Sequence, residues 1–335
     1  MRFREGRICL AAEEGAIAPR ANENHPGREP TSIHAPMATF LASLTNALKN
    51  RTAILGFFGA VFLVIFGALA TVGCASYAPA RPWERNRRKL QFAAPQGHKL
   101  YMDLYVPRTA RPAPVVVWIF GGSWKYGSNG YHLNLRDLTA SGMAIASIQY
   151  RLSGTAKYPA QLEDCRAAVQ WLRANGARYG IDPQRIGVSG ESAGGHLAAL
   201  LGTIEGAPSS RAVCALYPPT DLVALGRRYE SPVRPSDIDK LLGGPIEQRL
   251  ALAREASPVN HVTSKSPPFL IFHGANDTLV PVAQSEELRR RLVRAGVQSR
   301  LVVVPGKGHW FLLDRGQIAE VARFFQRHFG SAVSD

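Results

Sequence analysis

The residue best suited to chemistry in this sequence is Ser192, which stands between two glycines, Gly190 and Gly194. A short apolar run precedes this G-x-S-x-G stretch and a helix-forming segment follows it, which predicts a strand, a sharp turn and a helix. The glycines suit the turn because a Cβ there would collide with the neighbouring strand or helix. A serine at the tip of such a turn projects its Oγ above the sheet edge, so we predict that Ser192 is a nucleophile. The helix that begins at Ala193 would offer its first amide to an oxyanion.

A nucleophilic serine needs a base, and the candidates for the base and its partner are His309 and Asp277. Asp277 follows the apolar run 269–272, and His309 follows the run 300–304 in the glycine-flanked sequence PGKGHW. An imidazole titrates near neutral pH and can take and return the serine proton, while a carboxylate orients the imidazole and stabilises its cation. An aspartate beside an asparagine also commonly caps its own turn. Asp314, on the far side of His309, is the alternative acid.

An oxyanion hole needs a second set of backbone donors, and the loop after the apolar run 115–120 can supply them. We select the amides of Gly122 and Ser123 in the sequence FGGSW. The alternative is a tight Gly-Gly connection with no ligand role.

Three further histidines fall within expected helices or strands: His196, His273 and His328. We assign all three to structure, as hydrogen-bonded polar groups.

Strands alternate with helices along most of the chain, which predicts an α/β fold with a mostly parallel, doubly wound sheet and helices on both faces. Expected strands are 90–93, 100–106, 115–120, 143–149, 185–189, 212–217, 269–273 and 300–304, the first two forming an antiparallel pair. Expected helices are 159–177, 193–203, 281–295 and 317–329. Residues 218–266 break the alternation with one short helical pattern at 245–255, so we expect a small cap-like insertion over the carboxyl ends of the strands.

From about residue 89 to 329 the chain resembles the α/β-hydrolases, and within them the small carboxylesterases of the feruloyl-esterase-like and hormone-sensitive-lipase-like groups. The resemblance is carried by FGGSWKYGS, GIDPQRIGVSGESAGGHLAALL, YPPTDL, SPPFLIFHGANDTLVPVAQS and GKGHWF. The order nucleophile, acid, histidine is the one that this superfamily uses. One departure is Phe120, which stands where the resembling families have His at the start of the oxyanion loop.

The resemblance implies a serine hydrolase that cleaves short-chain carboxylic esters through an acyl-enzyme, with a small-molecule ester as its partner and no metal or organic cofactor. Ser192 would attack the acyl carbon, His309 would carry the proton, and Asp277 would hold His309. A peptidase or an arylformamidase on the same fold remains an alternative. A non-catalytic binding protein is a further alternative, although such proteins usually lack a triad member.

The N-terminal part has a different character. Residues 1–52 are expected to be disordered, or partly upstream of a true start at Met37. Residues 53–73 carry no charge and are long enough to span about 30 Å of hydrocarbon, so 53–74 is either a cleaved secretory signal or an uncleaved membrane anchor. The sequence Thr71-Val72-Gly73-Cys74 resembles a bacterial lipoprotein processing site, except that Thr71 stands where an aliphatic residue is usual. We therefore expect an exported, membrane-associated protein in which 75–88 is a linker and 89–335 the catalytic domain.

Cysteine spacing and charge add two expectations. The four cysteines have no metal-ligand spacing; Cys165 and Cys214 are expected to be buried thiols, with a bridge between them left open. The net charge of +15 comes from scattered arginines without a basic stripe interleaved with aromatic residues, so we expect no nucleic-acid partner.

Overall fold

The chain divides into two units, residues 1–69 and 70–335. The computed structural model describes most of the second unit, namely residues 84–130, 135–205, 210–228 and 236–330. The predicted extension 1–52 and the hydrophobic segment 53–74 lie outside these ranges. Within the ranges, no helix is both long and apolar enough to cross a membrane.

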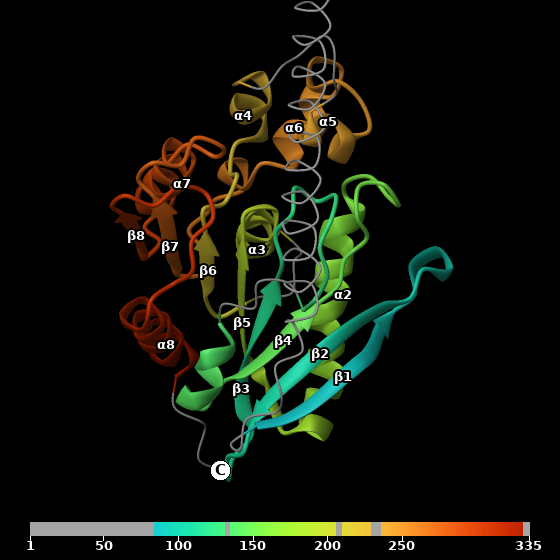
Figure 1. Ribbon diagram of the computed structural model, residues 1–335, viewed down its shortest axis with the longest axis vertical. Coiled ribbons are helices and arrows are strands. Elements are labelled where there is room, and N and C mark those ends of the chain that lie inside the picture. The colour runs from blue at the N-terminus through green and yellow to red at the C-terminus, as the bar shows by residue number, and fades with distance from the viewer. Residues whose placement is uncertain (1–83, 131–134, 206–209, 229–235, 331–335) are drawn as a thin grey trace, which may run out of the picture. The chain divides into compact units, whose positions relative to one another are not determined.

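The core of the domain is an 8-stranded sheet with the order β1-β2-β4-β3-β5-β6-β7-β8 (Figure 1). The strands are β1 (Glu84–Ala93), β2 (Leu100–Pro107), β3 (Ala113–Ile119), β4 (Ala144–Ile148), β5 (Ile181–Glu191), β6 (Val213–Leu216), β7 (Phe269–Gly274) and β8 (Ser299–Val304). The pairs β1·β2 and β2·β4 are antiparallel, and all other neighbouring strands are parallel. The predicted mostly parallel sheet with an antiparallel start is confirmed.

Helices cover both faces of the sheet, because each face of a central strand is apolar. In β3, Val115 and Val117 pack into one core cluster, while Val116 and Trp118 pack into the other. The first cluster includes residues of α2 (Ala160–Asn175), α3 (Ala193–Thr203) and α7 (Ala283–Arg294). The second includes residues of α8 (Arg315–Phe329) and of a short 3₁₀ helix, Arg136–Ser141. Strands buried on both sides need the continuous apolar runs that predicted them.

The insertion holds more helix than the sequence indicated. It forms α4 (Leu222–Arg228), α5 (Asp237–Leu242) and α6 (Leu250–Glu255), whereas only the region of α6 was expected to be helical. These helices lie at the top of Figure 1, beyond the ends toward which the parallel strands run. Leu225, Ile238 and Leu241 are buried, so the insertion packs through its own apolar side chains onto the domain.

The first strand begins five residues before the expected start of the domain at 89, inside the expected linker 75–88. The start of this strand was not predicted because its sequence, ERNRRK, is almost entirely charged, and strands are recognised in a sequence by alternating apolar residues. Glu84 is nevertheless buried: its carboxylate accepts from Arg136 at 2.8 Å and from the Thr139 hydroxyl at 2.6 Å. This paired charge ties the start of β1 to the sheet.

The two cysteines of the domain are free and buried. Cys165 belongs to the core cluster on one face of the sheet and Cys214 to the cluster on the other. They cannot form the bridge that the sequence left open, because the sheet lies between them. Burial raises the pKa of both thiols, for Cys214 to about 12.

Candidate active site

Ser192 lies at the sharp turn between β5 and α3, as the sequence predicted. Its backbone has φ 50° and ψ −120°, a strained conformation for a residue with a side chain. A Cβ on Gly194 would come within 2.0 Å of the carbonyl oxygen of Ile119, and one on Gly190 within 2.4 Å of the carbonyl oxygen of Gly194. Only glycine fits at these two positions, so the strand, the turn and the helix can pack closely enough to hold the serine at the tip.

The structure brings Ser192, His309 and Asp277 together from three separate parts of the chain. Ser192 Oγ lies 2.8 Å from Nε2 of His309, and Nδ1 of His309 lies 2.7 Å from Oδ2 of Asp277. The carboxylate can only accept, so Nδ1 of His309 carries the proton and Nε2 is free to accept from the serine hydroxyl. His309 is only 6% exposed and Asp277 7% exposed, which shields this chain of hydrogen bonds from water.

Asp277 is held as a carboxylate. Its Oδ1 accepts from the amides of Leu279 at 3.0 Å and Val280 at 2.8 Å. Burial raises the pKa of Asp277, but hydrogen bonds from His273, His309 and the Val280 amide outweigh burial and hold the pKa well below its ordinary value. The group therefore stays ionised at any pH where an imidazole titrates.

The alternative acid, Asp314, does something else. It is the N-cap of α8: its side chain accepts from the amide of Gln317, and the Gln317 side chain accepts from the amide of Asp314. Such a reciprocal capping box satisfies the free amides of a helix start. Asp314 therefore has a structural partner of its own.

The loop selected for oxyanion donors runs beside Ser192. A Cβ on Gly121 would lie 3.3 Å from Cβ of Ser192, and Ser123 and Ala193 line the same cavity as Ser192. The loop turns sharply, with φ of +105° at Gly122 and 53° at Ser123. A Cβ on Gly122 would lie 2.1 Å from the carbonyl oxygen of Tyr126, so this position requires glycine. Gly122 itself is not among the residues that line the cavity.

Phe120, which replaces the histidine of the resembling families, is part of the packing that holds this loop. Its ring stacks on Tyr150 with centroids 4.4 Å apart, and the Tyr150 hydroxyl donates to the Phe120 carbonyl at 3.1 Å. A Cβ on Gly127 would lie 2.6 Å from the Phe120 ring, so the far end of the loop closes over it. The aromatic residue therefore fixes the loop by packing.

His196 links the same loop to the insertion. Its Nδ1 accepts from the indole N–H of Trp124 at 3.1 Å, and its Nε2 donates to the carbonyl of Ala256 at 2.6 Å. Burial lowers the pKa of His196 to about 4, against the weaker opposing effect of the Ala256 hydrogen bond. The neutral form satisfies both contacts, which agrees with the structural role predicted for this histidine.

His273 is buried and hydrogen-bonded to Ser285 and Val280, as expected of a structural histidine, and it has one further contact that was not predicted. Its Nε2 lies 3.2 Å from Oδ2 of Asp277, so it contacts the carboxylate directly. Sequence reasoning missed this contact; the one signal for it is the spacing of four residues in HGAND, which spans the end of β7 and the turn after it.

A cavity of about 350 Å³ opens beside Ser192. Its apolar walls come from the insertion and from the loop after Asp277, and they include Leu225, Ile238, Leu279 and Val280. Asp237, at the start of α5, also lines it and pairs with Lys125 of the Gly122 loop at 3.0 Å. Beside Ser192, the described residues therefore form a largely apolar pocket with one charged side chain, Asp237, in its wall.

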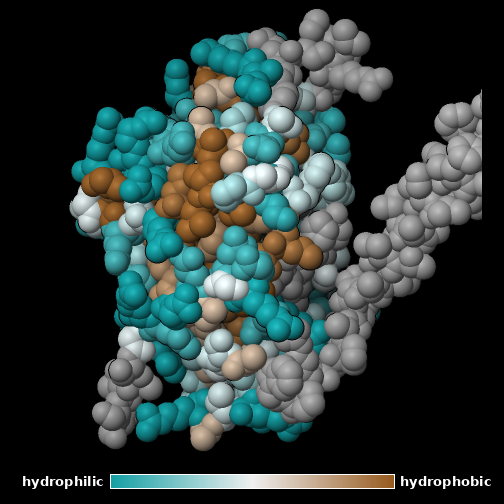
Figure 2. All heavy atoms as spheres, turned by 60° about the vertical axis from the view of Figure 1, so that its left-hand side comes forward, coloured by the Kyte–Doolittle hydropathy of each residue, from teal (hydrophilic) through white to brown (hydrophobic). Residues whose placement is uncertain are grey.

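Large apolar side chains are also exposed near the histidine. Trp310 is 69% and Leu312 70% exposed, directly after His309 in the sequence. Figure 2 shows that apolar side chains gather into a patch on the side that carries the C-terminal half of the domain.

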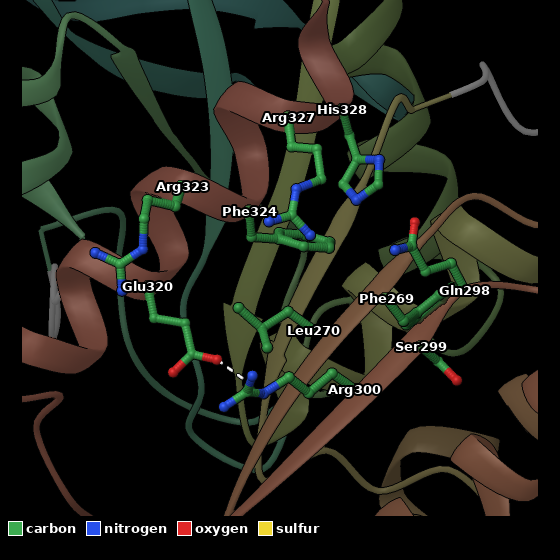
Figure 3. A pocket seen from close by; sticks show the side chains of 10 residues that line it. All are labelled: Phe269, Leu270, Gln298, Ser299, Arg300, Glu320, Arg323, Phe324, Arg327 and His328. Atoms are coloured by element: carbon green, nitrogen blue, oxygen red, sulfur yellow. Dashed lines mark ion pairs between the residues drawn. The ribbon is translucent and has the colours of Figure 1, made fainter.

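A second cavity, of about 320 Å³, lies at the other ends of the strands. Its lining comes from the starts of β7 and β8 and from α8 (Figure 3) and includes Phe269, Ser299 and His328. Arg300 pairs there with Glu320 at 3.0 Å. None of the candidate catalytic residues lies in it, and His328, predicted to be structural, packs edge to face on Phe324.

Comparisons with known proteins agree with this geometry. Residues 102–292, more than half of the chain, match a family model described as BD-FAE. The chain is 35% identical to esterase LipC of Mycobacterium tuberculosis over 230 residues, which are 63% of this chain and 57% of LipC. It thus spans little more than half the length of this curated relative.

Solved structures show the same fold. A truncated carbohydrate esterase from gut microbiota is 27% identical with a TM-score of 0.65, over 75% of this chain and 99% of that chain. A propionate-bound esterase, Est2 of Thermogutta terrifontis, is 26% identical with a TM-score of 0.61, over 77% of this chain and 99% of that chain. With its serine turn, its sheet order and the match over residues 102–292, the chain belongs to the BD-FAE family of α/β-hydrolases.

Proposed function

We propose that the protein is a hydrolase of carboxylic esters in which Ser192 is the nucleophile. The observation that carries this proposal is the hydrogen-bonded chain from Ser192 Oγ through His309 to Asp277, with distances of 2.8 and 2.7 Å. The similarity to LipC and to the two esterase structures supports the choice of ester over amide.

In the proposed mechanism, Ser192 is the nucleophile, His309 transfers the proton and Asp277 holds His309. Nε2 of His309 takes the hydroxyl proton as Ser192 Oγ attacks the acyl carbon, and then passes this proton to the departing alkoxide. Water attacks the acyl-enzyme in the second half of the reaction, again with His309 as base, and the acid is released. Asp277 holds Nδ1 of His309 and stabilises the imidazolium that forms in each step.

The oxyanion would be held by backbone amides of Ala193, Gly122 and Ser123. Ala193 opens α3, whose first N–H groups have no partner within the helix. Removing one donor of an oxyanion hole typically costs about 3 kcal/mol in transition-state stabilisation. Donors of the main chain do not need a histidine at position 120, and the packing of Phe120 described above would keep them in place.

The substrates we propose are esters with short acyl chains. The cavity beside Ser192 is apolar but small, at about 350 Å³. The Thermogutta esterase, for which propionate-bound and butyrate-bound structures are described, supports the same size class. For location, we propose export and attachment to a membrane through residues 53–74, on the ground of the uncharged sequence of 53–73 alone.

Covalent labelling by a fluorophosphonate probe tests this function, together with hydrolysis of p-nitrophenyl esters of rising chain length. We expect labelling of the wild-type protein and fastest turnover for acyl chains of about two to six carbons. Ser192→Ala should abolish labelling and lower turnover by several orders of magnitude while the protein stays folded. Near-native turnover by a clean Ser192→Ala preparation would show that Ser192 is not the nucleophile.

A further inference from the structure

A second imidazole reaches the carboxylate of Asp277. His273 is the fifth residue of β7 and is fully buried, and Asp277 follows it by four residues across a turn. Nε2 of His273 lies 3.2 Å from Oδ2 of Asp277, the same oxygen that lies 2.7 Å from Nδ1 of His309. One carboxylate oxygen thus faces two histidines that come from different strand ends.

The contacts of His273 assign its protons. Nε2 is 2.7 Å from the carbonyl oxygen of Val280, which can only accept, so Nε2 carries a proton and shares it between this carbonyl and Asp277. Nδ1 is 2.6 Å from the hydroxyl of Ser285, which can donate to it. A neutral imidazole protonated on Nε2 satisfies all three contacts.

These contacts close a ring around the carboxylate. Val280 donates its amide to Oδ1 of Asp277 and accepts from His273 through its carbonyl, while His273 donates to Oδ2. The carboxylate therefore cannot rotate about its Cβ–Cγ bond without breaking hydrogen bonds on both oxygens. The remaining direction at Oδ2 is the one taken by His309.

We propose that His273 is a positioning residue: it fixes the Asp277 carboxylate in the orientation from which Oδ2 holds His309 toward Ser192. This inference deepens the proposed function and rests on it. The contacts of His273 are with Ser285, Val280 and Asp277, so it reaches His309 and Ser192 through the Asp277 carboxylate.

Loss of the Nε2–H donor has two consequences. The carboxylate gains freedom to turn, so fewer molecules hold His309 in the productive orientation and kcat falls. The carboxylate also loses a donor that competes for its charge, so the imidazolium form of His309 becomes more favourable. Since imidazolium cannot accept the serine proton, the acid limb of the kcat/KM profile moves to higher pH.

Other groups near His309 stay the same in this experiment. The ring of Tyr217 packs against His309 with centroids 4.9 Å apart, and the Tyr217 hydroxyl donates to Glu191 at 2.8 Å. Asp277 contacts the imidazole directly, and His273 reaches it through Asp277. Neither Tyr217 nor Glu191 is changed in a His273 variant, so a moved acid limb reports on Asp277.

The test compares His273→Asn with His273→Gln. The amide nitrogen of Gln reaches the place of Nε2 and keeps the donor, whereas Asn reaches only the place of Nδ1. On p-nitrophenyl butyrate we expect His273→Asn to lower kcat by about ten- to hundredfold with KM nearly unchanged, and to move the acid limb upward. His273→Gln should recover most of kcat and the wild-type limb.

Ser285→Ala is the matched control, because it removes the partner of Nδ1 and leaves the Nε2 donor. Its acid limb should coincide with that of the wild type, whatever it costs in thermal stability. If His273→Asn and His273→Gln lose kcat equally and the acid limb does not move, His273 is only structural. A His273→Asn enzyme with wild-type kcat would also overturn the inference.

A measurement on the wild-type protein guards against a variant that does not fold. Nitrogen-15 spectra of the histidines should show a proton on Nε2 of His273, which the contacts with Val280 and Asp277 require. A His273 ring protonated on Nδ1 alone would refute the proposal. If the wild-type protein hydrolyses no ester, the proposed function fails, while the spectra still test separately whether His273 has the Nε2 proton that its contact with Asp277 requires.

Discussion

Asp277 and Asp314 are the two candidates for the carboxylate that holds His309, and their hydrogen-bond partners distinguish them. Asp277 accepts from His309 Nδ1 and from two backbone amides, while Asp314 accepts from the first turn of α8. A carboxylate that stabilises an imidazolium must lie within hydrogen-bond reach of the ring, and Asp277 meets this requirement. The same substitution should therefore remove most of the activity at Asp277 and leave the activity unchanged at Asp314.

We predict that Asp277→Asn lowers kcat by about 10⁴-fold with a small change in KM, because the amide favours the wrong tautomer of His309. Asp314→Asn should keep the wild-type kcat and the same free energy of unfolding, since Asn caps a helix about as well as Asp. Steady-state kinetics and urea unfolding of both variants check this. A large loss of kcat in Asp314→Asn would point to the wrong acid.

The sequence sufficed for the three candidate catalytic residues because each follows an apolar run, and parallel strands end at one edge of a sheet. It did not suffice for His273, whose side chain lies within the strand and looks like any buried polar group. Its contact with Asp277 depends on how the turn 274–276 folds back, and that is a tertiary property. The link from Trp124 to His196 was missed for the same reason: the two residues are 72 positions apart.

At the scale of elements, the oxyanion loop is held between α3 and the insertion. His196 of α3 accepts from Trp124 in the loop and donates to Ala256 after α6. The imidazole is fully buried and has no room for a second proton, because Nδ1 is occupied by the indole donor. Protonation of His196 must therefore break this link.

This arrangement predicts a loss of stability at acid pH. Burial lowers the pKa of His196 from 6.5 to about 4, so the unfolded chain binds a proton that the folded one does not. The contribution of neutral His196 to the free energy of unfolding is fully present above pH 6.5. It is lost as the pH drops toward 4, which lowers the free energy of unfolding by about 3 kcal/mol. Urea unfolding of the wild type and of His196→Gln between pH 7 and 4.5 measures it: the variant, which cannot titrate there, should show a flatter dependence. Parallel curves would contradict the prediction.

The walls of the cavity beside Ser192 should set the acyl length. Ile238 of α5 lines the cavity and is buried, so Ile238→Phe fills space that an acyl chain would occupy. We predict that the ratio of kcat/KM for p-nitrophenyl butyrate to that for the acetate falls about tenfold, the usual effect of one or two methylenes in an apolar pocket.

Val293→Phe provides the control for this substitution, because Val293 lies on α7 and is 53% exposed. It should leave the ratio of the two substrates unchanged. If Ile238→Phe lowers both substrates equally, then Ile238 does not contact the acyl chain and the cavity serves another part of the substrate.

The elements themselves were predicted to different degrees. Buried strands and long amphipathic helices follow from apolar patterns; α3 has the predicted bounds, and α2, α7 and α8 differ by one or two residues at their ends. The short helices α4 and α5 were not predicted, because a helix of six or seven residues shows little more than one turn of pattern and is stabilised by its tertiary contacts. The start of β1 was not predicted for a different reason: its buried residue is Glu84, whose charge is paired with Arg136, 52 positions away.

At the scale of the whole molecule, the domain that carries the site is preceded by the uncharged run 53–73 and by Cys74. The catalytic proposal does not depend on this part of the chain, since it rests on contacts among Ser192, His309 and Asp277. The N-terminal part would decide where the reaction takes place. Its two interpretations, a cleaved signal and an uncleaved anchor, predict different effects of a substitution at Cys74 on the mass of the protein.

We predict that the protein expressed from the full gene is found in the membrane fraction and resists extraction by salt, held either by residues 53–73 or by acyl groups on Cys74. If Cys74 is lipidated, the intact mass corresponds to a chain that begins at Cys74 with its acyl groups, and Cys74→Ser leaves a longer, unprocessed precursor. Several acyl chains are then needed for stable attachment, since one chain binds only weakly. If the segment is an uncleaved anchor, wild type and Cys74→Ser both keep residues 53–73 and differ only by the substituted atom. Intact mass spectrometry of the two proteins separates these outcomes, and a full-length product in the soluble cytoplasmic fraction would contradict both.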